Sequence, residues 1–171
     1  MKHFEIEQKY RIKNPSKVRA LLRRLGAIKI HAGNEYNELY DLSGQLRAKQ
    51  SILRLRRWGA KALLTFKGPR LKSKYKKRIE IETPVDFKSS QSLLSELGFR
   101  VIAEYRKKRE AFRLGSAIVT LDCLFGVGWF VEIEGQPKSI EITARKLGLS
   151  EKDLEERSYL QIVYPSWRNA D

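Results

Sequence analysis

The stretch EIEQKY (residues 5–10) places two carboxylates and an ammonium group on one side of a predicted β-strand. Side chains of a strand alternate between its two faces, so Glu5, Glu7 and Lys9 point in the same direction. The residues between them lie on the other face. The charged face is either exposed to water or directed into a site, and the remaining strands bear on that choice.

Several later segments repeat this alternation of charged and apolar positions. Acidic pairs at the spacing i, i+2 recur in two further EIE triplets, and basic pairs recur at the same spacing. The intervening residues are largely apolar, as expected for an antiparallel sheet with one charged and one apolar face. The charged positions are Glu80, Glu82, Glu132 and Glu134 in the acidic pairs, Arg54, Arg56, Lys107 and Arg109 in the basic pairs, and Lys67, Arg78 and Asp122 as single positions.

Two segments outside these strands are predicted to form amphipathic helices. Leucines share one face of residues 16–25 and of residues 89–97, and a glycine follows each segment. These leucines need an apolar surface, which the apolar face of the sheet provides. If the sheet closes on itself, its charged face becomes the lumen of a barrel and the helices cover the outside. The pattern therefore predicts an α+β fold, with an open antiparallel sheet that has one solvated face as the alternative.

The composition restricts the class of protein and of partner. A chain of 171 residues with 42 % hydrophobic residues is expected to fold as a single domain over residues 1–171. The net charge of +15 favours an anionic partner: nucleic acid, an acidic membrane surface or a phosphorylated small molecule. Cys123 is the only cysteine, which excludes an internal disulfide framework, and the presence of only two histidines disfavours a histidine-based metal site.

Signals for export and for the common nucleotide-binding loops are lacking in this sequence. The N-terminus has no apolar segment typical of a signal peptide, and no apolar run approaches the ~18 residues of a membrane span. We therefore expect a cytoplasmic protein that does not associate with a membrane. No GxxxxGK or GxGxxG loop occurs, so any binding of a triphosphate must rely on side chains rather than on a helix N-terminus.

The charged faces contain both kinds of group that triphosphate chemistry requires. Arginine binds phosphate oxygens in a bidentate manner, and lysine adds positive charge. Mg²⁺ or Mn²⁺ prefers carboxylate oxygens and bridges phosphates. Phosphoryl transfer then depends mainly on positioning and on neutralisation of charge. Carboxylates and basic residues that converge in a lumen are therefore consistent with a bound complex of a divalent metal ion and a triphosphate.

An ordered series of motifs resembles the CYTH superfamily, the triphosphate tunnel metalloenzymes. This group includes class IV adenylate cyclases, thiamine triphosphatases and inorganic triphosphatases. EIEQK alone matches the ExExK signature of the family weakly, whereas the whole series from residue 4 to about residue 164 is far more specific. The matching segments are EIEQK, LRLR, LTFKGP, RIEIE, KKR, TLDCLFGVGWFVEIEG and ERSY.

The resemblance implies a tunnel of eight antiparallel strands with helices packed outside, and it implies roles for the charged positions. Glu5, Glu7, Lys9, Glu132 and Glu134 would be the catalytic residues. The metal ligands would be Glu5, Glu7, Asp122, Glu132 and Glu134. The triphosphate would bind Lys9, Arg54, Arg56, Lys67, Arg78, Lys107 and Arg109. Supporting positions would be Glu80, Glu82 and Tyr159, the last in a segment that closes over the tunnel in some members.

Several functions remain open at the level of the sequence. Hydrolysis of a small-molecule triphosphate, such as inorganic triphosphate, ATP or thiamine triphosphate, is preferred because it needs only water, a metal and a held triphosphate. Cyclisation of ATP to cyclic AMP and pyrophosphate is the alternative, with the ribose 3′-hydroxyl as nucleophile. A non-catalytic binder of polyphosphate or nucleic acid is less favoured, since such a protein gains nothing from the carboxylates. A monomer and a homodimer are both compatible with the sequence, and Glu132 and Glu134 could instead form structural ion pairs with Arg54 or Lys107.

Overall fold

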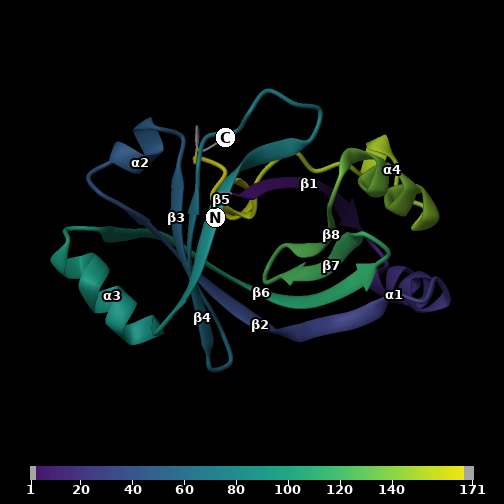
Figure 1. Ribbon diagram of the computed structural model, residues 1–171, viewed down its shortest axis with the longest axis horizontal. Helices are drawn as coiled ribbons and strands as arrows, with labels where there is room; N and C mark the ends of the chain where they lie inside the picture. Colours follow the sequence, from purple (N-terminus) through teal and green to yellow (C-terminus); the bar gives the residue numbers. More distant parts are fainter. Residues whose placement is uncertain (1–2, 168–171) are drawn as a thin grey trace.

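The computed structural model describes residues 3–167, and within them eight antiparallel strands close into a barrel (Figure 1). The order of strands around the barrel is β1-β5-β4-β3-β2-β6-β7-β8. The predicted α+β fold, with an antiparallel barrel and helices outside it, is confirmed. The strands are β1 His3–Ile12, β2 Ile28–Asp41, β3 Ile52–Trp58, β4 Lys61–Lys67, β5 Lys76–Val85, β6 Arg100–Leu114, β7 Ala117–Leu124 and β8 Gly128–Glu134.

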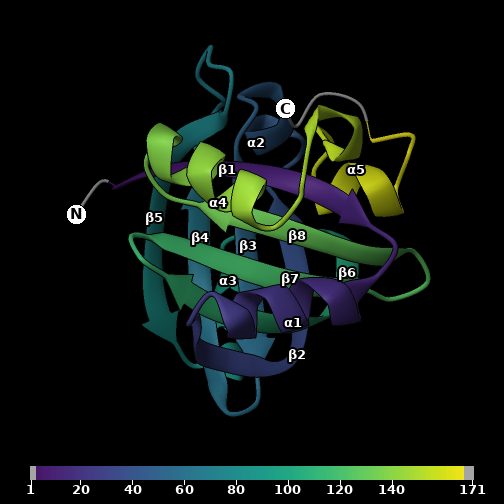
Figure 2. The same ribbon diagram turned by 90° about the vertical axis from the view of Figure 1, so that its right-hand side faces the viewer.

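The helices cover the outside of the barrel in two groups. Helices α1 (Pro15–Arg24) and α4 (Pro137–Lys146) lie over the strands β1, β8 and β7 (Figure 2), and α2 (Gln45–Ala48) and α3 (Phe87–Glu96) lie on the other side (Figure 1). A 3₁₀ turn (Glu151–Asp153) and α5 (Tyr159–Val163) complete the described chain. The two helices predicted from the leucine patterns are both present. None of the helices in residues 3–167 is long and apolar enough to cross a membrane.

Local capping explains where the two predicted helices begin. The side chain of Asn14 accepts a hydrogen bond from the backbone N–H of Lys17 at the start of α1, and Pro15 occupies the first turn. At the start of α3, the carboxylate of Asp86 accepts a hydrogen bond from the N–H of Ser89. These caps satisfy backbone donors that have no partner within the helix.

Strand β2 is the element that the charge pattern did not indicate. Its 14 residues do not alternate cleanly, because polar residues occupy both faces. Glu35 and Asn37 face the lumen, whereas Glu38 faces α3 and accepts hydrogen bonds from the Tyr40 hydroxyl (2.7 Å) and the Gln91 amide (2.7 Å). The buried carboxylate of Glu38 on the outer face breaks the alternation of polar and apolar residues, so the pattern did not predict this strand.

The main hydrophobic core lies between the barrel and its helices rather than inside the barrel. Val119, Val131 and Ile133 point outward from β7 and β8 and are fully buried beneath Leu22 of α1 and Ile140 of α4. A smaller cluster lies under α3, where Leu94 packs against the β-strands. This arrangement leaves the lumen free to hold charged side chains.

Helix α5 closes one end of the barrel with apolar and aromatic side chains. Tyr159, Leu160 and Ile162 are buried in a cluster with Leu39 and Phe130 of the barrel wall. The ring of Tyr159 packs edge-on against Phe130 at 5.5 Å between centroids. The lumen is therefore closed at the end where β2 and β7 finish and β3 and β8 begin.

Adjacent leucines on α3 test whether the helix is held by its buried face. Leu94 is 6 % exposed and Leu93 is 61 % exposed. Leu94→Ala should lower the free energy of unfolding by about 2–5 kcal/mol through lost burial and a cavity. Leu93→Ala should change it by about 0.5 kcal/mol or less. Urea denaturation measures both, and equal losses would contradict the packing described for α3.

Candidate functional site

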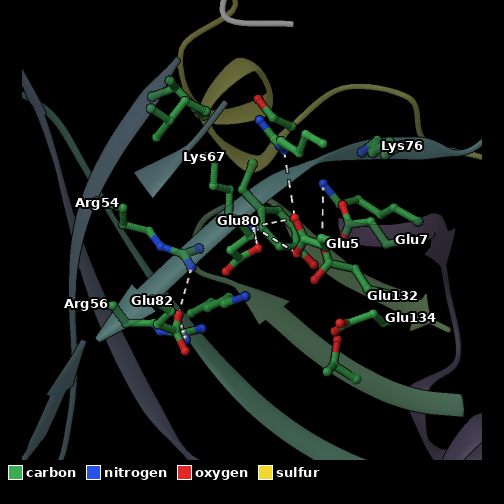
Figure 3. Close-up of a pocket in the computed structure, with 18 of the residues that line it drawn as sticks. Glu5, Glu7, Arg54, Arg56, Lys67, Lys76, Glu80, Glu82, Glu132 and Glu134 are labelled. Carbon is green, nitrogen blue, oxygen red and sulfur yellow. Dashed lines mark hydrogen bonds and ion pairs between the residues drawn. The ribbon is translucent and has the colours of Figure 1, made fainter. Parts of the chain in front are cut away.

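The lumen contains a cavity of about 450 Å³ that is lined by charged side chains from strands all around the barrel (Figure 3). These strands bring together all but one of the residues that the sequence singled out, the exception being Asp122, which lies in the wall beside the cavity. The predicted residues that line the cavity are Glu5, Glu7, Lys9, Arg54, Arg56, Lys67, Arg78, Glu80, Glu82, Lys107, Arg109, Glu132, Glu134 and Tyr159.

Two carboxylates at one side of the cavity form no ion pair with the described basic residues around them. Glu7 and Glu134 lie directly opposite each other in the β1–β8 pairing. In the described part of the chain, neither forms an ion pair within 4 Å. Burial raises the pKa of Glu134 to about 7, and the negative charges of Glu5, Glu7 and Glu80 raise it further in the same direction. This side of the lumen therefore carries excess negative charge.

Lys67 holds the next two carboxylates together. Its ammonium group lies 2.7 Å from Glu5 Oε2 and 2.8 Å from a carboxylate oxygen of Glu80. Arg78 approaches the same oxygen of Glu5 at 3.8 Å. Glu5 and Glu80 are thus paired with basic residues, unlike Glu7 and Glu134.

The donor set at this side of the cavity fits a divalent cation. Within residues 3–167, no three acidic, histidine or cysteine side chains already converge as a formed metal site. Glu5, Glu7 and Glu134 nevertheless provide the hard oxygen ligands that Mg²⁺ and Mn²⁺ prefer. Burial and, after it, the charges of Glu5, Glu7 and Glu80 raise the pKa of Glu134, and a bound cation would favour its ionised form.

The opposite side of the cavity is basic and is organised around Glu35, which the sequence analysis missed. This carboxylate is 3 % exposed and lies 3.5 Å from Lys107 and 3.8 Å from each of Arg56 and Arg109. Burial alone would raise its pKa, but the positive charges of Lys107, Arg109 and Arg56 lower it to about 2. Glu35 and Asn37 lie two residues apart and therefore share one face of β2. This spacing could have identified Glu35 if the strand had been recognised.

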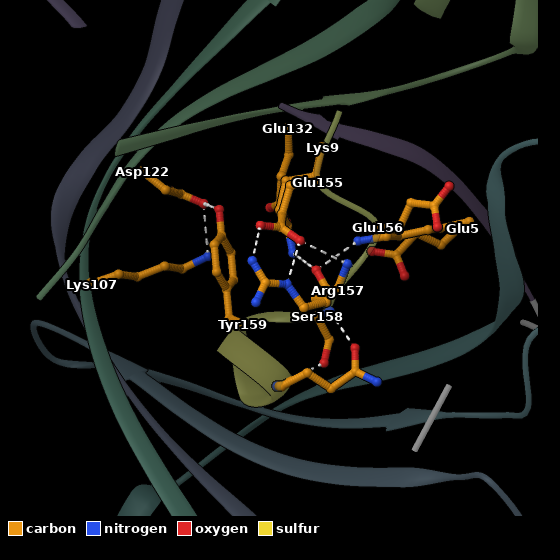
Figure 4. A network of polar contacts seen from close by, with 12 residues as sticks. Glu5, Lys9, Lys107, Asp122, Glu132, Glu155, Glu156, Arg157, Ser158 and Tyr159 are labelled. Carbon is orange, nitrogen blue, oxygen red and sulfur yellow. Dashed lines mark hydrogen bonds and ion pairs between the residues drawn. The ribbon is translucent and has the colours of Figure 1, made fainter. Parts of the chain in front are cut away.

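Three side chains donate hydrogen bonds to Asp122, and Figure 4 shows two of them, Lys107 and Tyr159. Its carboxylate accepts hydrogen bonds from Lys107 (3.0 Å), Arg109 (2.6 Å) and the Tyr159 hydroxyl (2.7 Å), and it is fully buried. The second carboxylate on Arg109 is Glu132, also at 2.6 Å. In this arrangement Asp122 positions basic residues, and its expected contact with a metal stays a prediction.

The segment before α5 covers two lysines of the lumen. Lys9 and Lys76 donate hydrogen bonds to the carbonyl oxygen of Arg157, at 3.0 and 3.2 Å. Burial lowers the pKa of Lys76 to about 7, and the nearby charge of Lys9 adds to this effect. Lys76 also lines the cavity, although the sequence analysis did not single it out. Lys76 lies two residues before Arg78 on β5, so both side chains share the strand face that points into the lumen. This spacing could have identified Lys76 from the sequence.

The expected partners of Glu132 and Glu134 differ from those considered from the sequence. Glu132 pairs with Arg109 and, at 3.5 Å, with Lys9, rather than with Arg54 or Lys107. Arg54 instead lies near Glu82 at 3.9 Å and donates to the Thr65 hydroxyl. Arg54 and Glu132 are thus separate parts of the lumen wall.

Comparison with known proteins identifies the family. The model of the CYTH domain matches residues 3–159. The chain belongs to the CYTH domain family. Among its relatives, "Putative adenylate cyclase MJ0240" of Methanocaldococcus jannaschii is 27 % identical over 174 residues, which covers 92 % of this chain and 97 % of the relative. Adenylate cyclase CyaB of Aeromonas hydrophila is also 27 % identical, covering 91 % of this chain and 86 % of that protein.

A solved structure shows the same architecture. The PH1012 protein of Pyrococcus horikoshii superposes with a TM-score of 0.81 at 27 % identity. The match covers 92 % of this chain and 98 % of that one. The CYTH fold therefore extends over nearly the whole length of both proteins.

The position of Glu35 among three basic residues generates a prediction about pH. Because its pKa is lower in the folded protein than in the unfolded chain, ionised Glu35 stabilises the fold above about pH 4.5. This contribution is lost as the pH falls through 4.5 toward 2. We expect Glu35→Gln to be less stable than the wild type by about 3 kcal/mol at pH 7. The difference should shrink by roughly half between pH 5 and pH 3.

Urea denaturation of both proteins at pH 7, 5 and 3 measures this difference. A gap that stays constant over that range would show that the charge of Glu35 does not contribute to stability.

Proposed function

We propose that this protein catalyses metal-dependent hydrolysis of a triphosphate held inside the barrel. The observation that carries the proposal is the division of one cavity into a side with unpaired carboxylates and a side with basic residues. Membership in the CYTH domain family supports the class of enzyme, which acts on triphosphates. The assignment of individual residues below is part of the proposal.

The basic side supplies the contacts for the phosphates. Arg54, Arg56, Lys107 and Arg109 come from two strands, β3 and β6, and line the same cavity. Each is held by carboxylates that it can share with, or release to, a phosphate oxygen: Arg56 contacts Glu82 at 3.0 Å and lies 3.8 Å from Glu35. The wall therefore keeps the arginines in position before the substrate arrives, which lowers the cost of ordering them.

The acidic side would hold the divalent cation. Glu5, Glu7 and Glu134 would be its ligands, and the cation would neutralise phosphate charge and favour ionisation of an attacking water. Lys67 keeps Glu5 and Glu80 in place by its two short contacts.

Cyclisation of ATP is the second candidate, and the names of the two relatives favour it. Both carry the name adenylate cyclase. The same basic residues would hold the triphosphate, and the nucleophile would be the 3′-hydroxyl of the ribose, with pyrophosphate leaving. Hydrolysis remains our first proposal because it requires no precise placement of the ribose. The products of the reaction separate the two.

A panel of triphosphates tests the proposal directly. Inorganic triphosphate, ATP, GTP and thiamine triphosphate are each incubated with Mg²⁺ or Mn²⁺, and products are separated by chromatography. We expect phosphate release that chelation of the metal abolishes. Glu134→Gln and Glu5→Gln should each lower kcat by about 100-fold or more, because each removes a charged ligand of the cation. Glu96→Gln, on the exposed end of α3, is the control and should match the wild type.

If ATP yields cyclic AMP and pyrophosphate, the activity is cyclisation and not hydrolysis. Near-normal turnover in both lumen variants would show that these carboxylates are structural.

Two adjacent arginines on β3 provide a matched test of the phosphate path. Arg56 lines the cavity, whereas Arg57 is exposed on the outer face and lies over the ring of Phe87 at 4.9 Å. Arg56→Ala should weaken binding of inorganic triphosphate by about 10- to 100-fold, the effect of losing charge-assisted hydrogen bonds. Arg57→Ala should leave the affinity within about twofold. Calorimetric titration at fixed ionic strength compares them, and equal losses would indicate diffuse surface electrostatics instead of a path through the lumen.

A further inference from the structure

The formal charges of the lumen cancel, so the excess positive charge of the protein lies elsewhere. The lumen cavity and its wall contain eight basic and eight acidic side chains, the acidic set including the buried carboxylates of Glu35 and Asp122. The net charge of +15 therefore belongs to the rest of the chain, outside the reach of a triphosphate bound in the lumen. An excess of this size favours a second anionic partner on the outer surface.

A groove on the outer surface gathers part of this charge. Its volume is about 560 Å³, and it lies where β1 ends, α1 begins and the chain passes from α4 into the 3₁₀ turn. Figure 2 shows α1 and α4 on this face of the barrel. Four exposed basic side chains line the groove: Arg11, Lys13, Lys17 and Lys152. Within residues 3–167, none of the four forms an ion pair within 4 Å.

The two carboxylates that also line the groove have other partners. Asp153 accepts hydrogen bonds from the backbone N–H and the hydroxyl of Ser150, both at 3.0 Å. Glu155 pairs with Arg157 at 2.6 Å. The basic side chains of the groove are therefore available to an anionic ligand.

The floor of the groove is apolar and partly aromatic. Trp129, Leu147, Leu149 and Leu154 line it and are buried or half-buried, so they lie deeper than the exposed basic side chains. Basic groups around an aromatic floor suit a ligand that combines negative charges with flat rings. An unpaired nucleic-acid strand has this chemistry, whereas a duplex hides the faces of its bases. A membrane surface suits a protruding apolar face, which this recessed floor does not provide.

We propose that the groove between the start of α1 and the 3₁₀ turn binds single-stranded nucleic acid, with phosphates on the four basic side chains and a base against Trp129. Phosphate contacts from lysine and arginine hold a strand in place without reading its sequence. The site is separate from the lumen, because no residue that lines the groove also lines the lumen cavity. The proposal therefore goes beyond the proposed function and does not depend on it.

Binding of a labelled oligothymidine of about 12 nucleotides without a 5′-phosphate tests the proposal by fluorescence anisotropy. An oligouridine of the same length is measured beside it, since DNA and RNA share the phosphates and base faces that the groove would bind. We expect Kd to rise about 20- to 50-fold between 50 and 200 mM salt, as for three or four neutralised phosphates of a single strand. Failure of both oligonucleotides to bind would overturn the proposal.

Saturating inorganic triphosphate with Mg²⁺ should not displace the oligonucleotide, because the two ligands occupy different sites. Displacement would place the strand in the lumen and would overturn the groove as its site. Lack of triphosphate cleavage would contradict the proposed function alone and would leave this binding unchanged.

A double variant and a control with the same loss of charge locate the site. Lys13→Gln combined with Lys17→Gln should raise Kd at least 10-fold and lower the slope of log Kd against log salt by about 1.4. Lys61→Gln combined with Lys88→Gln removes two exposed charges at the start of β4 and on α3, and should change Kd by no more than about twofold. Equal losses in the two double variants would indicate diffuse attraction and would overturn the site.

Other polyanions test the role of the aromatic floor. A DNA duplex of the same length and a polyglutamate of similar charge should each bind at least fivefold more weakly than the single strand, because neither presents free base faces to Trp129. Vesicles that contain phosphatidylserine should not bind. Equal or tighter binding of any of these three would assign the groove to a duplex, an acidic peptide or a membrane and would overturn the proposal.

Discussion

Charged side chains that are removed from water must be paired, and the interior of this barrel is arranged around that requirement. The cost of desolvating an ion is recovered only when opposite charges and hydrogen bonds surround it. Arg109 meets this condition between Asp122 and Glu132, each 2.6 Å away. Glu35 has three basic groups within 3.8 Å, although its Oε2 has no hydrogen-bond partner within the described residues. The carboxylates of Glu7 and Glu134 form no ion pair within the described residues, and this local imbalance is the feature on which the proposed cation site rests.

A charged lumen forces the hydrophobic core to the outside of the barrel. The residues on the outer face of β7 and β8 are buried only because α1 and α4 cover them (Figure 2). The stability of the fold therefore depends on contacts that do not involve the lumen. This separation allows the lumen to keep groups whose burial is costly, among them Glu134 and Asn37, whose amide has no hydrogen-bond partner within the described residues.

The C-terminal segment connects these two layers. Tyr159 reaches from α5 to the buried carboxylate of Asp122, and its ring lies 3.9 Å from the Lys9 ammonium and 4.6 Å from that of Lys107. The carbonyl of Arg157 accepts hydrogen bonds from the same Lys9 ammonium group and from that of Lys76. The segment thus closes the barrel by contributing polar contacts to the basic side and apolar contacts to the end wall.

The sequence by itself determined which charged residues of β1, β3, β5, β6 and β8 share a face, because strand periodicity is a local property. Glu5, Glu7 and Lys9 share a face wherever β1 is placed, and the leucines of α1 and α3 require an apolar surface in any fold. The order of the motifs also indicated the family, and through it the eight strands. Which side chains pair with each other in three dimensions could not be predicted from the sequence pattern. The match of Glu7 with Glu134, the three donors on Asp122 and the partners of Glu35 join residues far apart in the chain, so they depend on strand order and register around the barrel. Strand β2 stayed hidden because the buried carboxylate of Glu38 on its outer face is satisfied by Tyr40 and by Gln91 of α3, a contact that exists only after the helix has packed on the barrel.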